Sequence, residues 1–166
     1  AVIAGGLRST GKAGKLAAKV AKEIPILLRK APVAKQFADD LAENVARKFG
    51  GKLQKAPIKT ADRITEKVVK DYGGDLNQLK DVARNTITVS DPETVIKTLE
   101  ELKKSGSLAG EPKDFFSTPH PTGYRTIITN QRAPNGLTTE IQVTLPELFE
   151  AKIKKGDALY HEWRTL

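Results

Sequence analysis

Residues 121–143, PTGYRTIITNQRAPNGLTTEIQV, contain two short runs rich in β-branched side chains, Tyr124–Gln131 and Leu137–Val143. The two runs are joined by Ala133–Gly136, whose Asn-Gly pair favours the tight turn of a β-hairpin. We therefore predict two adjacent antiparallel strands in this segment.

The second predicted strand carries polar side chains on one face. Because side chains alternate along a strand, Glu140 and Gln142 are expected side by side on that face. The opposite face carries Thr139, Ile141 and Val143. Tyr124, on the first predicted strand, would project near the acid and the amide. An aromatic ring, a carboxylate and an amide together make a suitable floor for a nucleotide site.

The composition indicates a single basic domain. The 166 residues are enough to bury one core, and the formal net charge of +8 favours a polyanionic partner such as a nucleotide, RNA or an acidic protein. The Lys/Glu alternation over 95–104 fits a solvated helix face equally well. With no Cys, the chain has no disulfide, thiolate nucleophile or Cys-type zinc site, and only His120 and His161 could serve as imidazole bases.

The chain lacks an apolar run long enough to span a bilayer and lacks the start of a secretory signal, so we expect a soluble domain. It also contains no Met. We therefore expect it to be the C-terminal piece of a longer polypeptide.

The N-terminal third predicts a linker followed by helices. Residues 1–15 are small, Gly-rich and basic, as in a flexible linker, and residues 16–50 predict a helical scaffold. We expect two helices there, with Pro25 at a boundary or a kink. On the second helix, a stripe at four-residue spacing is expected to be buried: Val33, Phe37, Leu41, Val45 and Phe49.

Residues 51–166 predict the functional core. An extended segment, 52–59, leads to a helix capped by Thr60 and ending near Tyr72, with Ile64 and Val68 inward. Its exposed face carries Arg63, Lys67 and Lys70, with Lys59 at its entrance. These cations beside a helix N-terminus suit phosphates, although a solvated basic face has the same composition.

The remaining segments complete an α+β pattern. We expect a strand over 82–89 with Asp81 at its opening, a helix beginning at 90–93, and an irregular, substrate-gripping segment over 105–118. A closing helix is expected over 146–163, with Leu148, Ile153 and Leu159 inward. The fold class is α+β, a small mixed sheet covered by helices. Walker-type phosphate loops, Ser-His-Asp triads and His-rich metal spacing are absent from the sequence.

Four stretches resemble, in order and spacing, the synthetase domain of the RelA/SpoT alarmone synthetases: Ile58–Lys67, Asp81–Arg84, Gly123–Thr126 and Glu140–Gln142. The tail Asp157–Trp163 is similar to the closing helix of that family. The resemblance covers the chain from about residue 55 to its end. It implies a nucleotidyltransferase-like fold that transfers the β,γ-pyrophosphate of ATP to the 3′-hydroxyl of an acceptor nucleotide.

The resemblance also implies roles for individual residues. Phosphates of ATP would be held by Lys59 and Lys67, and we add Arg63 and Arg84 as candidate phosphate contacts because their basic side chains lie in the same two stretches. Asp81 and Glu140 would bind Mg²⁺, and Glu140 would also activate the attacking hydroxyl. Tyr124 would stack on the acceptor base, and Arg125 and Gln142 would support the acceptor. This assignment agrees with the general needs of phosphoryl transfer, which uses a hard cation on carboxylates and cations on phosphates.

The chain departs from the family pattern at Pro57, Arg63, Arg84, Ile128 and Thr144. A linker in front of a Met-free core is similar to the C-terminal toxin modules of secreted interbacterial effectors, among them those that make (p)ppApp. We therefore expect a secreted effector domain that acts in the cytoplasm of a target bacterium and is blocked by a cognate immunity protein. AMP, ADP or ATP is the favoured acceptor.

Three alternatives remain at the level of the sequence. The acceptor could be a guanine nucleotide, giving (p)ppGpp, or the 3′ end of tRNA. The third alternative is a basic nucleic-acid-binding module without activity, in which Glu140 is an ordinary strand residue. The few aromatic residues, five Phe, three Tyr and one Trp, do not favour base-stacking surfaces of the usual kind.

Overall fold

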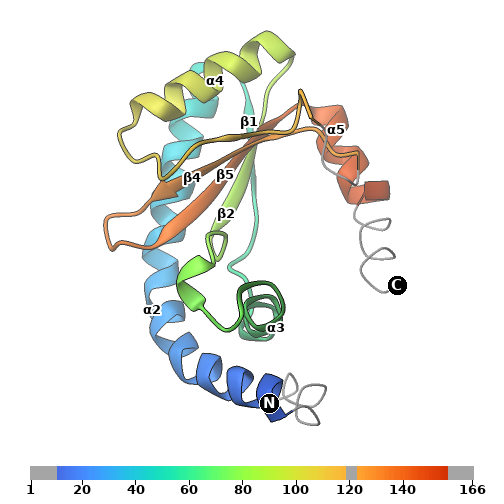
Figure 1. Cartoon of the computed structure of the whole chain (residues 1–166). Coiled ribbons are helices and arrows are strands. Elements are labelled where there is room, and N and C mark those ends of the chain that lie inside the picture. Colours follow the sequence, from blue (N-terminus) through green and yellow to red (C-terminus); the bar gives the residue numbers. More distant parts are fainter. Residues whose placement is uncertain (1–10, 119–122, 157–166) are drawn as a thin grey trace.

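A five-stranded mixed sheet forms the centre of the protein (Figure 1). The computed structural model describes residues 11–118 and 123–156. In spatial order the strands are β1 (Lys52–Lys55), β2 (Arg84–Thr88), β5 (Thr138–Thr144), β4 (Ile127–Arg132) and β3 (Lys113–Asp114). Only β2 and β5 pair in parallel; the other three pairs are antiparallel. The predicted mixed sheet is confirmed, and the segment expected to be irregular contains β3.

The predicted hairpin is present as β4 and β5. Its turn is closed by a hydrogen bond from the Ala133 amide to the Leu137 carbonyl, and Gly136 has a φ of 86°, a conformation that favours glycine. The predicted alternation on β5 is confirmed, since Ile141 and Val143 are buried in the core while Glu140 is half-buried. However, β4 begins at Ile127, so placing Tyr124 on the strand was wrong.

A single 38-residue helix, α2 (Gly11–Lys48), replaces the two predicted helices. It begins inside the segment interpreted as a linker, and it continues through Pro25 and Pro32. Both prolines are exposed, so the carbonyl groups that they leave without a helical partner can be hydrated. The helix is bent rather than broken, and it curves along the sheet (Figure 1).

Alanine side chains form much of the buried face of α2, together with part of the expected stripe, since Val45 is buried and Leu41 and Phe49 pack against the core. Val33, a member of the expected stripe, is 57% exposed. The buried small residues are Ala31, Ala34, Ala38, Ala42 and Ala46. Because alanine is short, the helix backbone can approach the neighbouring elements closely.

Two core clusters divide α2 along its length. The C-terminal half packs, together with α4 (Pro92–Lys104), on one face of the sheet, where Ile87, Ile141 and Val143 are buried. The N-terminal half packs against α3 (Ala61–Tyr72) through Val20, Ile24 and their neighbours. One helix therefore holds α3 in place beside the sheet.

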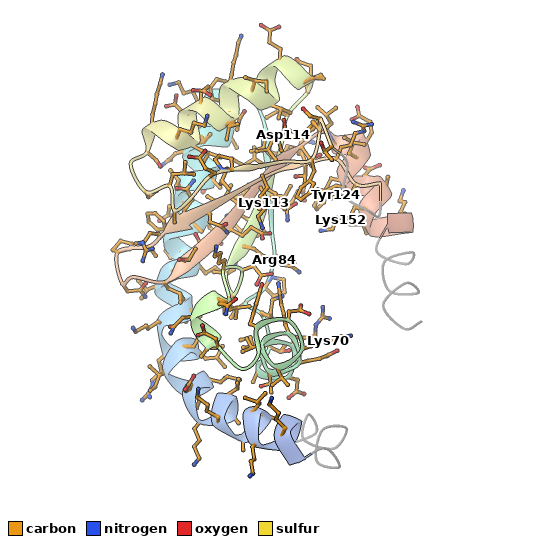
Figure 2. All side chains as sticks on the ribbon, viewed as in Figure 1. Lys70, Arg84, Lys113, Asp114, Tyr124 and Lys152 are labelled. Carbon is orange, nitrogen blue, oxygen red and sulfur yellow. The ribbon has the colours of Figure 1, made fainter. Side chains whose placement is uncertain are left out.

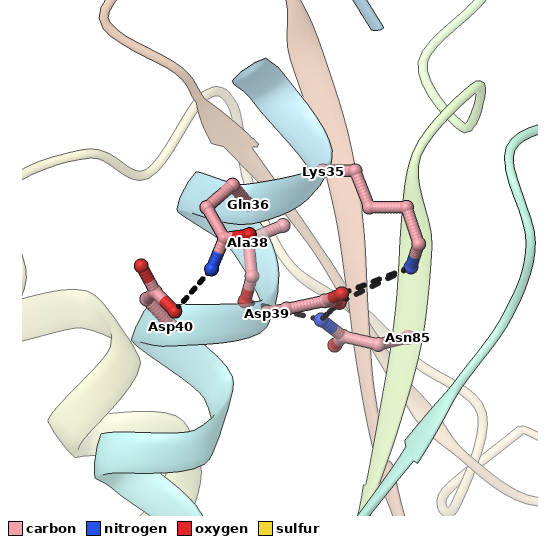
Figure 3. Close-up of polar contacts among 6 residues, drawn as sticks. All are labelled: Lys35, Gln36, Ala38, Asp39, Asp40 and Asn85. Carbon is pink, nitrogen blue, oxygen red and sulfur yellow. Dashed lines mark hydrogen bonds and ion pairs between the residues drawn. The ribbon is translucent and has the colours of Figure 1, made fainter. Parts of the chain in front are cut away.

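A buried polar cluster connects α2 to β2 (Figure 3). The Asn85 side-chain amide donates to the Ala38 carbonyl oxygen and to Asp39 Oδ1, both at 3.0 Å. Lys35 pairs with Asp39 Oδ2 at 3.0 Å. Asn85 and Asp39 are only 2% and 7% exposed, so these contacts fix the position of the helix on the strand.

The predicted closing helix is helical throughout its described part, residues 146–156, and its remainder lies outside the described residues. α5 spans Pro146–Ala151 and a π-helical turn follows over Lys152–Gly156. The expectation that Ile153 is buried was wrong, since it is 56% exposed. Leu159, His161, Trp163 and His120 lie outside the described residues. Among the described helices, none is long and apolar enough to cross a membrane.

Candidate functional site

Two lysines and one aspartate form the centre of the site. Lys59 Nζ lies 3.2 Å from Asp81 Oδ2, and Lys67 Nζ donates to the same oxygen at 3.0 Å. Asp81 and Lys59 are largely buried, and Lys67 is partly exposed. A carboxylate and two ammonium groups, all predicted from the sequence, are therefore brought together.

Local structure explains how these three side chains meet. The Lys59 amide donates to the Val82 carbonyl, which joins the entrance of α3 to the residue after Asp81. Thr60 caps α3 by accepting from the Arg63 amide, as predicted, and Lys67 follows two turns later. Asp81 lies just before β2, so the site joins the helix to the N-terminal end of that strand.

Burial and the ion pairs set the pKa values of the three groups. Burial raises the pKa of Asp81, but the charges of Lys59 and Lys67 and their hydrogen bonds outweigh it and hold the pKa below its usual range. For Lys59 burial dominates, so its pKa is lowered despite Asp81. Burial also lowers the pKa of Lys67, but Asp81, Tyr72 and Glu140 more than offset it and raise the value.

A cavity of about 170 Å³ opens at this cluster. It is lined by Lys59, Arg63, Glu66, Lys67, Asp71, Asp81 and Arg84. All four cations that the sequence analysis proposed for ATP phosphates thus line one cavity. The sequence interpretation missed Glu66 and Asp71, although their spacing from Arg63 and Lys67 on one helix face was available as a signal.

Glu140 lies on the strand next to the cluster. In the parallel β2–β5 ladder Glu140 is the partner of Arg84, and the Glu140 amide donates to the Ala83 carbonyl at 3.0 Å. Gln142 Nε2 donates to Glu140 Oε1 at 2.7 Å, so the predicted acid–amide pair is in contact. The strands of the two carboxylates are therefore neighbours, as a shared metal requires.

Asn130 is a further polar residue beside Glu140 that the sequence interpretation missed. It faces Glu140 directly across the antiparallel β4–β5 ladder. Directly opposed residues lie about 5 Å apart, so the amide is within reach of a group bound at Glu140. The pairing of Asn130 with Glu140 can be obtained by counting residues outward from the hairpin turn along both strands. The hairpin sequence could therefore have identified Asn130.

Tyr124 and Arg125, two of the acceptor residues assigned by resemblance, lie outside the lining of the cavity at Asp81. Tyr124 is half-buried, and Lys152 Nζ lies 5.2 Å from the centre of its ring; Figure 2 shows these two side chains near each other and Arg84 farther toward α3. The Arg125 guanidinium donates to the Phe116 carbonyl, so it holds the segment that follows β3. Gln142 is the one acceptor residue in contact with Glu140.

Asp81 and Glu140 are the two carboxylates that could hold Mg²⁺. Asp81 Oδ1 is buried without a hydrogen-bond partner among the described residues, and Glu140 Oε1 is engaged by Gln142. The described part of the chain contains no group of three or more acidic or imidazole side chains arranged for a metal. Mg²⁺ commonly uses one or two carboxylates together with water and substrate phosphates, so the pair fits this ion.

Comparisons with known proteins give a consistent assignment. No family model matches the chain. It is 38% identical over 123 residues to the (p)ppApp synthetase toxin Tas1 of Pseudomonas aeruginosa (strain UCBPP-PA14); the match covers 74% of this chain and 27% of that protein, so the chain spans about a quarter of its curated relative.

Solved structures extend the comparison. The Type VI effector Tas1, in the complex with its immunity protein, matches with a TM-score of 0.70 and 30% identity, covering 87% of this chain and 86% of that one. Small alarmone synthetase 1 of Bacillus subtilis, bound to its product pppGpp, matches with a TM-score of 0.69 over 86% of this chain and 82% of that one. The identity is 15%, so the second match shows the shared fold alone.

Proposed function

Because this chain belongs to the family of the RelA/SpoT-like alarmone synthetases and has the toxin Tas1 among its relatives, we propose that it is an ATP pyrophosphokinase. It transfers the β,γ-pyrophosphate of ATP to the 3′-hydroxyl of an acceptor nucleotide and releases AMP. The acceptor is an adenine nucleotide, and the products are of the (p)ppApp type.

The observation that carries this proposal is the cluster of Lys59, Lys67 and Asp81 beside Glu140. Phosphoryl transfer involves little covalent chemistry by the protein and depends on positioned charges. The two lysines, with Arg63 and Arg84 on the same cavity, supply cations for a triphosphate. Glu140, on the adjacent strand, supplies the acceptor of a hydroxyl proton.

Asp81 and Glu140 would hold Mg²⁺ at the junction of β2 and β5. When bound, the ion would supply positive charge to the phosphate oxygens of the transferred group. Glu140 accepts the proton from the 3′-hydroxyl, and Gln142, which donates to Glu140 Oε1, holds that carboxylate in position. Asn130, opposite Glu140, orients the acceptor ribose. Tyr124 stacks on the acceptor base.

The biological role follows from the relatives. Tas1 is described as a Type VI effector with an immunity protein. We extend this to the present chain: it is the toxin domain of a secreted effector, acts on nucleotides in the cytoplasm of a target bacterium, and is neutralised by a cognate immunity protein. The preference for adenine rests on 38% identity to a (p)ppApp synthetase.

The test is a panel of acceptors with the purified chain, Mg²⁺ and ATP. AMP, ADP, GDP, GTP and tRNA are added separately to labelled ATP, and products are separated by anion exchange. We expect adenine products with AMP release. Products only with guanine nucleotides would overturn the adenine assignment, and label that moves from ATP only onto tRNA would overturn a free-nucleotide acceptor. No transfer to any acceptor would overturn the enzymatic proposal.

A further inference from the structure

The first three turns of α2 carry an unbalanced row of lysines. Lys12, Lys15, Lys19 and Lys22 are all exposed, and residues 11–22 contain no Asp or Glu. At 100° per residue the four side chains leave the helix within an arc of about 80°, and they extend over about 15 Å of helix length. These four lysines, the α2 lysine row, carry charge equal to half of the net +8 of the chain.

Several of the cations elsewhere on the helices are held in ion pairs, whereas in the described part of the chain the four lysines of the row follow one another without one. Helix-borne pairs include Lys35–Asp39, Arg47–Glu43, Lys48–Glu101, Lys97–Glu93 and Lys103–Glu100. Within the described residues, the four lysines of the row form no ion pair, although Glu23 follows Lys19 by one turn. Four like charges at spacings of about 4.5 to 6 Å along an axis repel one another unless a polyanion lies against them.

The surroundings of the row select the kind of polyanion. Specific protein interfaces are depleted in Lys and use aromatic residues or Arg as anchors. Residues 11–22 contain neither an aromatic residue nor an Arg. A helix that lies in a membrane surface needs its apolar face, but Val20 and Ile24 are buried against Ile64 and Val68 of α3 and its neighbours. Evenly spaced lysines without aromatic residues are suited to phosphate contacts that carry no sequence information.

The packing of α2 also selects the form of the nucleic acid. One side of its N-terminal half is covered by α3, so the helix is not free to enter the major groove of a duplex. A flexible single strand can instead lie along the exposed side, with successive phosphates against successive lysines. We propose that the α2 lysine row is a binding surface for the backbone of single-stranded RNA, separate from the nucleotide cavity.

Fluorescence anisotropy of a labelled single-stranded RNA of about 20 nucleotides tests this proposal, using the whole chain without ATP. The test variant is Lys12→Gln/Lys15→Gln/Lys19→Gln/Lys22→Gln, because Gln removes charge but retains helix propensity. The control removes the same charge elsewhere: Lys97→Gln/Lys103→Gln/Lys104→Gln/Lys113→Gln. Circular dichroism confirms the helix content of both variants.

The test variant is expected to bind at least tenfold more weakly at low salt, while the control stays within about threefold of the native chain. The slope of log affinity against log salt should become shallower by about 3, since each phosphate contact to a single strand contributes about 0.7. Equal weakening of both variants would overturn the proposal, because net charge alone would then explain binding. Native affinity in the test variant would overturn it as well.

Three further binding measurements, with duplex DNA, with anionic lipid vesicles and with competing ATP, test the kind of ligand and the place where it binds. Equal or tighter binding of duplex DNA, or row-dependent binding only to vesicles of anionic lipid, would overturn the choice of single-stranded RNA. Competition by ATP that abolishes RNA binding would place the RNA in the nucleotide cavity and overturn a separate surface. Pyrophosphate transfer between free nucleotides should be unchanged in the test variant, so the enzymatic proposal can stand or fall separately.

Discussion

Glu140 is the residue on which the proposed chemistry depends most directly. Glu140→Gln retains the size of the side chain but removes the acceptor of the hydroxyl proton. We expect transfer to fall by about 10²- to 10⁴-fold, the usual contribution of a general base. The measurement is the initial rate of AMP release with ATP and acceptor saturating.

The matched control for this change is Glu100→Gln, an exposed glutamate on α4. It should leave the rate within about twofold, because surface substitutions of this kind rarely disturb a fold. A Glu140→Gln protein that is folded and retains native rates would contradict the role assigned to this carboxylate.

Asp81 has a structural role besides its proposed role in metal binding. In Asp81→Asn the ammonium groups of Lys59 and Lys67 lose their shared carboxylate, and Lys59 remains largely buried. We expect the free energy of unfolding at pH 7 to fall by about 2 to 4 kcal/mol, because removing one partner leaves a buried charge uncompensated. Urea denaturation without nucleotide measures this change.

The difference in the free energy of unfolding between the native protein and Asp81→Asn should depend on pH in a definite direction. The pKa of Asp81 is held below its ordinary 3.8, so its stabilising contribution is present above that value and is lost as the pH falls through the lowered pKa. The difference between native and variant proteins should therefore narrow in acid. Glu43→Gln, in an exposed pair with Arg47, should change stability by less than about 0.5 kcal/mol. If the difference in the free energy of unfolding between the native protein and Asp81→Asn grew as the pH fell, the ion pairs of Asp81 could not be its cause.

Sequence reasoning predicted the residues of this cluster but not all of their neighbours. Lys59 and Lys67 followed from the helix that begins at Thr60, and Asp81 and Glu140 from a resemblance in motif order. Asn130 was missed because its position depends on the register of β4 against β5. Tyr124 was placed on the strand because an aromatic residue favours strands, yet the β4–β5 ladder begins only at Ile127.

At the scale of elements, α3 carries Arg63 and Lys67, two of the cations proposed to bind phosphate. Thr60→Ala removes the side-chain oxygen that accepts from the Arg63 amide, and Thr60→Ser retains it. The Ala variant should lose about 1 kcal/mol of stability and the Ser variant much less. The measurement is the thermal midpoint by circular dichroism. If the two variants lose equal stability, the cap has no part in holding α3.

The contact between α2 and β2 provides a second prediction at this scale. Asn85→Ala removes the amide that binds Ala38 and Asp39, so a buried carboxylate retains Lys35 alone (Figure 3). We expect a loss of about 2 to 3 kcal/mol in urea denaturation.

Gln36→Ala is the control for Asn85→Ala, because it breaks the exposed Gln36–Asp40 contact on the same helix. It should change the free energy of unfolding by less than about 0.5 kcal/mol. If Asn85→Ala and Gln36→Ala lowered the free energy of unfolding by similar amounts, the buried contacts of Asn85 would stabilise the protein no more than an exposed contact does.

The course of α2 shows where sequence patterns fail at the scale of elements. A strict four-residue repeat drifts by about 40° per step around a helix, so the expected stripe from Val33 to Phe49 could not stay on one face. The buried residues follow the 3.6-residue period instead, and many of them are alanines, whose small size gives little hydrophobic signal. Pro25 was expected at a helix boundary or a kink, but α2 continues through both Pro25 and Pro32, which are exposed.

At the scale of the whole molecule, the fold places a cation-lined cavity beside an acidic strand. α2 connects the sheet, which carries Glu140, to α3, which carries Lys67. The mixed sheet and its helices could be predicted from strand and helix patterns. The order β1-β2-β5-β4-β3 depends on contacts between distant segments, and local sequence does not encode these.

The central claim is that two phosphates move together from ATP to one hydroxyl group. The most direct measurement is mass spectrometry of the products formed from ATP and ADP by the purified chain with Mg²⁺, with AMP quantified in the same samples. One AMP is expected for each acceptor that gains a diphosphate at its 3′-oxygen. An acceptor that gains a single phosphate with release of ADP, or AMP formation without any modified acceptor, would contradict it.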